Sequence, residues 1–403
     1  MAEDNEPVVD FLAEGVEVED EEDLERAELK ELKQTVVAAS DWTAETIISQ
    51  LDRGNIDINP AFQRRDAWTA SRKSRFVESL IMGLPIPQLV LAESKRQKGS
   101  FIVIDGKQRL LSLRQFAAKK DDQKYQILKL EKLEARNDLN GKSLSDLETN
   151  PALAEDLSAF QNQTIRTVVI KNWPNESVLY LIFLRLNTSS VPLSPQELRQ
   201  ALHPGPFLSF VDERSGTILG FRRLLKLTKP DFRMRDAELL VRFLAFKNFL
   251  TKYKGNLKSF LDDTCAELNE QWVKRENDLK EQVNQLEEAI SASFTIFGED
   301  RAFRKWEGAS FERRFNRAVF DVMVFYFSDP KVRNKALAQA RGVEADFKKV
   351  CETGSEFRRS IETTTKSLDA TATRLSVWGK ALSRRLKISF AIPELVGKQI
   401  VFK

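Results

Sequence analysis

The stretch from Phe101 to Leu113, FIVIDGKQRLLSL, constrains the fold more than any other part of the chain. It opens with aromatic and β-branched apolar residues, which are typical of a buried strand. Asp105-Gly106 interrupts this run, and the leucines that follow, together with Phe116, have the spacing of a helix that packs against the strand. The sequence therefore predicts a strand, a glycine turn and a helix start in close succession.

A helix start of this kind leaves backbone N–H groups at the positive end of the helix dipole. An anion binds well there, and phosphate is the usual one. Lys107 and Arg109 add positive charge, Gln108 adds hydrogen bonds, and Asp105 either orients Arg109 or holds a metal ion. On local pattern alone, a phosphate site and an ordinary Asp-Gly turn with a solvated basic helix start explain these residues equally well.

Four ordered motifs, which together cover about residues 40–205, resemble the GmrSD-type domain of modification-dependent restriction and phage-defence proteins. They are Asp105-Gly-Lys-Gln-Arg109 (family signature DGQQR), Phe62-Gln63-Arg64 with Trp68 (YQR…W), Gly83-Leu-Pro-Ile-Pro87 before a strand (G-x-P-I-P), and Phe183–Thr188 followed by Pro192–Leu198 (F-x-R-L-N-T…P-L-S-x-x-E-L). Two residues depart from the family pattern. Lys107 replaces the usual Gln and adds a cation at the expected phosphate, whereas Phe62 replaces the usual Tyr and removes a hydroxyl.

The resemblance implies a ParB/sulfiredoxin-like domain that binds and hydrolyses a nucleoside triphosphate, with Mg²⁺ as an expected companion. Arg109 is expected to point outward from the helix start, and Asn187 either reads a substrate amide or caps a turn. Asp105 is also the candidate metal ligand, and the candidate catalytic residues are Asp105, Arg109 and Arg64. The residues expected to hold the nucleotide are Gln63, Arg64, Asp105, Gly106, Lys107, Gln108, Arg109 and Asn187.

Composition excludes several classes of protein. The single histidine, His203, excludes an HNH nuclease and a C₂H₂ finger, and its place after a helix favours a C-terminal cap. Restriction-type members of the family carry an HNH domain, so the resemblance implies a separate nuclease subunit or a stand-alone defence protein. Two cysteines give no disulfide framework, and no apolar run approaches the ~20 residues of a membrane span, so we expect a cytoplasmic protein.

Charge divides the chain unevenly. Residues 1–34 carry a net charge of −11, which leaves +14 on the remainder of a chain whose total is +3. We expect residues 1–39 to form an acidic, largely disordered arm, with a tail that covers a basic site as the sharper alternative. Basic clusters in the later half, Arg222-Arg223 and Arg313-Arg314 with Arg317, are expected to contact DNA, although a solvated helix face explains any one of them.

The predicted architecture is α+β, with a ParB/sulfiredoxin-like domain over residues 40–205 and an α-helical domain over 206–403. Within the first domain, strands are expected at 88–93, 101–104, 125–130 and 165–171. A helix is expected from Pro195, because Ser194 is a good N-cap and Glu197 lies in the first turn. In the second domain, a long apolar stripe predicts one helix over 267–290.

Three functions remain open at this point. The first is a nucleotide-binding and NTP-hydrolysing component of a restriction or phage-defence system that senses or acts on DNA. The second is a metal-dependent nuclease or nickase that uses Asp105 and Glu93, since Glu93-Ser-Lys95 fits half of a nuclease motif. The third is a DNA-binding or regulatory module without turnover. The sequence leaves the identity of the nucleotide, the DNA that is recognised and a homo-oligomeric state open.

Overall fold

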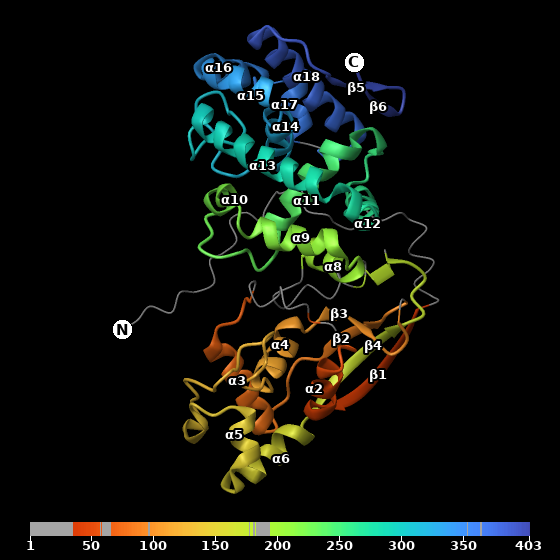
Figure 1. The fold of residues 1–403 in the computed structure, drawn as a ribbon, viewed down its shortest axis with the longest axis vertical. Coiled ribbons are helices and arrows are strands. Elements are labelled where there is room, and N and C mark those ends of the chain that lie inside the picture. Colours follow the sequence, from red (N-terminus) through yellow and green to blue (C-terminus); the bar gives the residue numbers. More distant parts are fainter. Residues whose placement is uncertain are drawn as a thin grey trace. The chain divides into compact units, whose positions relative to one another are not determined.

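The structure is a computed structural model that describes residues 35–56, 58, 66–95, 97–176, 178–179, 182, 194–352, 354–362 and 365–403. The expected acidic arm lies outside these residues up to position 34. The chain forms two compact units (Figure 1). The N-terminal unit contains the described residues up to Pro204 and also Lys229–Met234, and the helical unit contains Gly205–Thr228 and Arg235–Lys403.

A four-stranded mixed sheet forms the centre of the N-terminal unit. Its strands are β1 (Val36–Thr43), β2 (Leu89–Glu93), β3 (Phe101–Asp105) and β4 (Thr164–Lys171), in the spatial order β1-β4-β2-β3. The pairs β1–β4 and β2–β3 are antiparallel, whereas β2 and β4 are parallel. This sheet, followed by a mostly helical unit, confirms the predicted α+β class.

Helices pack around this sheet and around the turn that joins β3 to α4. This turn, Asp105–Lys107, is called the signature turn below. α2 (Ala44–Asp52), α3 (Ala70–Ile81), α4 (Lys107–Phe116) and α6 (Ala154–Asn162) pack against one another, and α8 (Pro195–Leu202) contacts β3. Short helices α5 (Leu144–Thr149), η4 (Asn137–Leu139) and η5 (Pro151–Leu153) lie between α4 and α6 in the sequence. Because α4 leaves directly from the end of β3, the Asp105–Lys107 turn lies where β3, α4 and α8 meet.

Side chains on both faces of the sheet are buried. On one face, Val90, Ala92 and Ile104 form a hydrophobic cluster that includes Leu198 and Leu202 of α8. Since successive side chains of a strand point to opposite faces, the alternate residues lie on the other face, where they too are buried: Leu89, Leu91, Val103 and Val169. The sheet is therefore a two-sided core that fixes the position of its β3 end.

The ends of α8 follow the sequence prediction closely. Ser194 Oγ accepts a hydrogen bond from Glu197 N at 3.1 Å, and Glu197 Oε2 accepts one from Ser194 N at 2.8 Å. This reciprocal capping box confirms Ser194 as N-cap and Pro195 as the first helical residue. His203 is the C-cap residue, as predicted, and its Nε2 lies 3.0 Å from Glu176 Oε2.

The helical unit is built from ten α-helices and one short 3₁₀ helix in its described part and ends in a two-stranded hairpin. Its long helices are α11, α12, α13 and α18, and none of the described helices is long and apolar enough to span a membrane. The elements are α9 (Pro206–Ser215), α10 (Leu219–Leu224), α11 (Arg235–Phe249), η6 (Leu250–Lys252), α12 (Leu257–Glu270), α13 (Trp272–Phe297), α14 (Arg317–Phe327), α15 (Pro330–Ala338), α16 (Ala340–Val350), α17 (Glu356–Glu362), α18 (Leu368–Leu386), β5 (Pro393–Val396) and β6 (Gln399–Phe402).

Three sequence predictions about local structure are wrong. Val36–Thr43 is a strand, although the predicted arm included its first residues, and its pairing with β4 stabilises it. Residues 125–130 form a loop because their groups bond elsewhere: Tyr125 Oη donates to the Ile58 carbonyl, and Leu128 N donates to Gln115 O at 2.9 Å. The predicted helix over 267–290 breaks at Gln271, which allows Trp272 to pack against aromatic side chains of α9.

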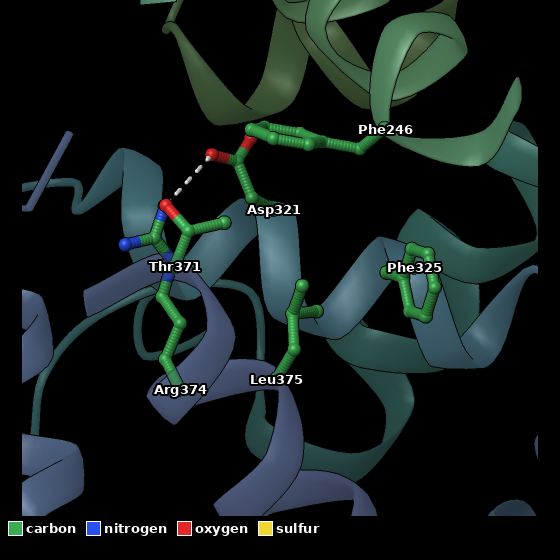
Figure 2. A pocket seen from close by; sticks show the side chains of 6 residues that line it. All are labelled: Phe246, Asp321, Phe325, Thr371, Arg374 and Leu375. Carbon is green, nitrogen blue, oxygen red and sulfur yellow. Dashed lines mark ion pairs between the residues drawn. The ribbon is translucent and has the colours of Figure 1, made fainter. Parts of the chain in front are cut away.

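A buried ion cluster joins three helices of the helical unit. Asp321 of α14 accepts hydrogen bonds from Arg242 of α11, and its Oδ2 lies 3.9 Å from Arg374 Nη2 of α18. All three side chains are buried. Figure 2 shows Asp321 and Arg374 beside a small recess, together with the ring of Phe246 and the hydroxyl of Thr371. Arg242 Nη1 also lies 3.9 Å from Glu238 Oε1, so two carboxylates face the two buried arginines and the cluster is a structural feature of the unit.

Candidate functional site

The signature turn adopts a backbone conformation that favours glycine. Gly106 is the N-cap residue of α4 and has φ of +98°. A Cβ at this position would lie 2.3 Å from Leu89 Cδ2 and 3.3 Å from Arg109 Nε. Among the described residues no side chain caps α4, and its first turn carries no acidic residue. The start of α4 therefore presents backbone N–H groups and a positive dipole end that no side-chain cap occupies within the described residues.

Arg109 folds back over this turn. Its Nη2 donates to Gln88 O and to Asp105 Oδ2, both at 2.9 Å, and the residue is only 6% exposed. The expectation that Arg109 points outward is therefore wrong, because the guanidinium finds two oxygen acceptors at the ends of β2 and β3. Its Nε is buried and has no hydrogen-bond partner within the described part of the chain. A buried N–H group without an acceptor costs stability, so an acceptor atom of a bound ligand would stabilise Arg109 Nε.

Lys107 takes a different direction from the one expected. Its ammonium lies 2.5 Å from Glu197 Oε1 at the start of α8, and both side chains are buried. The cation that departs from the family pattern is therefore compensated by an internal carboxylate. Because Lys107 is the first residue of α4 and Glu197 is in the first turn of α8, this ion pair holds two helix starts together.

Gln108 ties the loop before α3 to the signature turn. Its Oε1 accepts a hydrogen bond from Trp68 N at 3.3 Å. The Trp68 ring packs edge-on against Phe76 at 5.9 Å between centroids, and the Arg72 guanidinium lies 4.8 Å from its centre. Before a helix, a single tryptophan either packs as a hydrophobic staple or stacks on a base, and the contacts of Trp68 with Phe76 and Arg72 favour packing.

The predicted site residues fall into two groups. Asp105, Gly106, Lys107, Gln108 and Arg109 all lie at the β3–α4 turn, as predicted. Gln63, Arg64 and Asn187 lie outside the described residues. Sequence reasoning missed one residue that contacts this turn, Glu197 of α8. Glu197 belongs to a recognised motif, but its partner Lys107 lies 90 residues earlier in the sequence, and only the fold reveals that pairing.

The geometry does not support a nuclease centre built from Asp105 and Glu93. In the β2–β3 hairpin Asp105 lies opposite Val90, whereas Glu93 lies opposite Phe101. These positions are separated by roughly 10–13 Å along the strands. Lys95 Nζ lies 4.2 Å from the centre of the Trp173 ring and donates to a nearby carbonyl. Lys95 of the Glu93-Ser-Lys95 tripeptide therefore packs against Trp173.

The described residues show the carboxylate of Asp105, the candidate Mg²⁺ ligand, in contact with Arg109. Among them, no three His, Cys, Asp or Glu side chains gather where they could hold a metal ion. The Asp105 carboxylate already accepts a hydrogen bond from Arg109. Asp105 therefore orients Arg109, one of the two roles that its sequence position predicted, and its role as a Mg²⁺ ligand stays a prediction.

The basic cluster at the start of α14 is only partly exposed. Arg313 and Arg314 are exposed on the loop before the helix. Arg317, however, is largely buried, and its Nε lies 3.4 Å from Glu238 Oε1. A buried arginine with a carboxylate partner is not placed to contact DNA phosphate. The predicted cluster is therefore reduced to Arg313 and Arg314.

The second predicted basic cluster lies on α10 and divides in the same way. Arg222 donates to the Gly216 carbonyl at 2.8 Å and is half-buried, so it stabilises its own helix start. Arg223 is exposed, with Glu299 4.0 Å away. Of this pair, Arg223 alone presents its side chain to solvent.

The N-terminal unit is thus an α+β domain with a glycine turn and an open helix start at the junction of β3 and α4. Residues 44–204 match the model of the family described as GmrSD restriction endonuclease, N-terminal domain. This match confirms the resemblance that the four motifs predicted. Neither a curated protein nor a solved structure matches the chain. The ParB/sulfiredoxin-like name for this fold accordingly stays a prediction.

Proposed function

We propose that this chain is the nucleotide-binding, NTP-hydrolysing component of a DNA restriction or phage-defence system. The GmrSD match over residues 44–204 supports the restriction setting. The observation that carries the nucleotide site is the start of α4, where within the described chain no side chain provides a cap and a buried Arg109 keeps a donor without a partner. A phosphate group supplies the acceptor oxygens that both features lack.

In this proposal each signature residue has a distinct task. The backbone N–H groups of Lys107 and Gln108 bind phosphate oxygens, and Arg109 Nε adds a charged hydrogen bond. Asp105 and the Gln88 carbonyl hold the guanidinium in place, so it needs no reorganisation as charge develops on the phosphate. Fixed donors of this kind stabilise phosphoryl-transfer transition states. Gln63 and Arg64 lie outside the described residues, and their expected binding to the nucleotide stays a prediction.

The test is conservative replacement of Arg109. Arg109→Lys keeps the charge but removes the forked donor, and loss of one charge-assisted hydrogen bond costs about 1.5–3 kcal/mol. We expect affinity for a nucleoside triphosphate to fall about 10- to 100-fold. Calorimetry with ATP, GTP, CTP and UTP measures binding, and phosphate release measures hydrolysis.

Arg114→Lys is the matched control for this experiment. Arg114 lies on the same helix and also pairs with carboxylates, Asp122 at 2.6 Å and Asp52 at 3.4 Å. It should lose similar stability but bind nucleotide normally. Equal nucleotide affinity in wild type and Arg109→Lys, or an equal loss in both variants, would contradict the assignment of the phosphate site to Arg109.

We further propose that the helical unit contacts DNA through Arg313 and Arg314, and that a separate nuclease subunit cuts it. Charge reversal of both arginines to glutamate should weaken DNA binding most at low salt and reduce the salt slope by about 2. Reversal of Lys331 and Lys335, two exposed residues of α15, changes the net charge equally and serves as control. Equal effects of the two double variants on filter binding would rule out a specific contact at Arg313 and Arg314.

A further inference from the structure

Helix α8 buries an unusual amount of polar surface beside the signature turn. Four of its residues are buried although they are polar or charged: Gln196, Glu197, Arg199 and Gln200. Glu197 pairs with Lys107. Arg199 Nη1 donates to Gln196 Oε1 at 2.8 Å. The charged groups of Glu197 and Arg199 therefore both have polar partners. The amides of Gln196 and Gln200 are only partly hydrogen-bonded.

Each of these glutamines keeps one amide atom without a hydrogen bond. In the part of the chain that the structure describes, Gln196 Nε2 and Gln200 Oε1 are buried and have no partner. The orientation of the Gln196 amide is fixed, because a guanidinium can only donate and so the amide oxygen must face Arg199. The atom left over is therefore a donor. Gln200 contributes an acceptor, and both lie within one turn of α8.

The spacing of the two amides places them side by side. Residues four apart on a helix have Cβ atoms about 5–6 Å apart on the same face. A buried donor and a buried acceptor lower the stability of the protein when neither has a hydrogen-bond partner, because each has lost its hydrogen bond to water. Together they complement a planar group that presents an acceptor beside a donor. The hydrogen-bonding edge of a nucleobase has this pattern, whereas a phosphate has acceptors only.

We infer that Gln196 and Gln200 recognise the base of the nucleotide whose phosphates bind at the start of α4. This inference rests on the proposed function. Its geometric support is the Lys107–Glu197 ion pair, which fixes α8 next to the signature turn.

If Gln200 binds a base, replacing it should raise the stability of the ligand-free protein. Methionine resembles glutamine in length and flexibility but carries no amide. Gln200→Met removes a buried acceptor that has no partner in the described chain, so the ligand-free protein should melt at a higher temperature than wild type. A glutamine that only supports the fold would give an unchanged or lower melting temperature. Higher stability combined with lost base selectivity is the signature of a binding residue.

The experiment measures binding of ATP, GTP, CTP, UTP and inorganic tripolyphosphate to the full chain. Wild type should prefer one nucleotide, and Gln200→Met and Gln196→Met should each weaken that preference about 3- to 10-fold per lost hydrogen bond. Affinity for tripolyphosphate, which has no base, should not change. Gln123→Met, an exposed residue of the same unit, is the matched control and should behave as wild type.

The outcomes separate this inference from the proposed function. If wild type binds neither tripolyphosphate nor any nucleotide, the phosphate site itself is wrong. If tripolyphosphate binds but wild type shows no preference among bases, or the variants keep that preference, the phosphate site stands and base recognition by α8 is wrong. Variants that change binding of a short single-stranded oligonucleotide, with nucleotide selectivity intact, would assign the two amides to a DNA base and overturn the inference.

Discussion

Replacement of Asp321 by alanine should destabilise the helical unit by about 3–5 kcal/mol, the usual cost of removing one partner from a buried ion pair. The change leaves Arg242 and Arg374 buried without the carboxylate between them. Urea unfolding followed by far-UV circular dichroism should show a clearly lower midpoint. Asp321→Asn keeps the shape and some hydrogen bonds, so its effect should be intermediate.

Asp346→Ala is the matched control for Asp321→Ala. Asp346 also pairs with an arginine, Arg385 at 2.6 and 2.9 Å, but this pair is open to solvent and should contribute at most about 1 kcal/mol. The Arg385 guanidinium holds the pKa of the Asp346 carboxyl below its usual range. Its contribution is therefore present at pH 7 and disappears only as the pH falls through that lowered pKa. Equal losses for both variants at pH 7 would show that the Asp321 cluster is not a special source of stability.

The second large effect is expected at the Lys107–Glu197 ion pair. Either Lys107→Gln or Glu197→Gln alone leaves one buried charge without this partner and should cost about 3–5 kcal/mol. The double variant carries two neutral amides that can hydrogen-bond to each other, and it should recover most of that loss. Lys107→Gln also restores the residue that the family usually has, so the single variant shows whether that residue requires a different partner.

A double-mutant cycle measures the coupling between Lys107 and Glu197. Residues in direct contact show interaction free energies of about 0.5–3 kcal/mol, and this buried pair should lie in the upper half of that range. Additive losses of stability in the double variant would mean that the two side chains act independently.

The parts of the fold that the sequence predicted are those with local signals. Apolar β-branched residues followed by Asp-Gly predicted the β3–α4 turn, since strand, turn and helix signals lie next to one another. The Ser194–Glu197 capping box is equally local, and it predicted where α8 begins. The family motifs predicted which turn matters, and the match over residues 44–204 confirmed that resemblance.

The parts that were not predicted depend on partners far away in the sequence. Val36–Thr43 is a strand because β4 supplies its hydrogen bonds, and residues near 166 are not visible from a window around 36. Arg109 could point outward on local grounds, yet the Gln88 carbonyl and the Asp105 carboxylate turn it inward. The two unpaired amides of α8 are likewise invisible in the sequence, because an exposed and a buried glutamine are written with the same letter.

The N-terminal unit does not end where its family match ends. Lys229–Met234 belongs to it, although the residues on either side belong to the helical unit, and Lys229 Nζ donates to the Asp66 carbonyl at 3.3 Å. No single cut in the gene can therefore yield both units whole. A fragment that stops at Pro204 lacks the six residues Lys229–Met234 of its own unit. The fragment that starts at Gly205 contains these six residues but lacks the unit to which they belong. Exchange of either unit between relatives would accordingly require crossovers at three places, after Pro204, Thr228 and Met234, which ties the inheritance of the two units together.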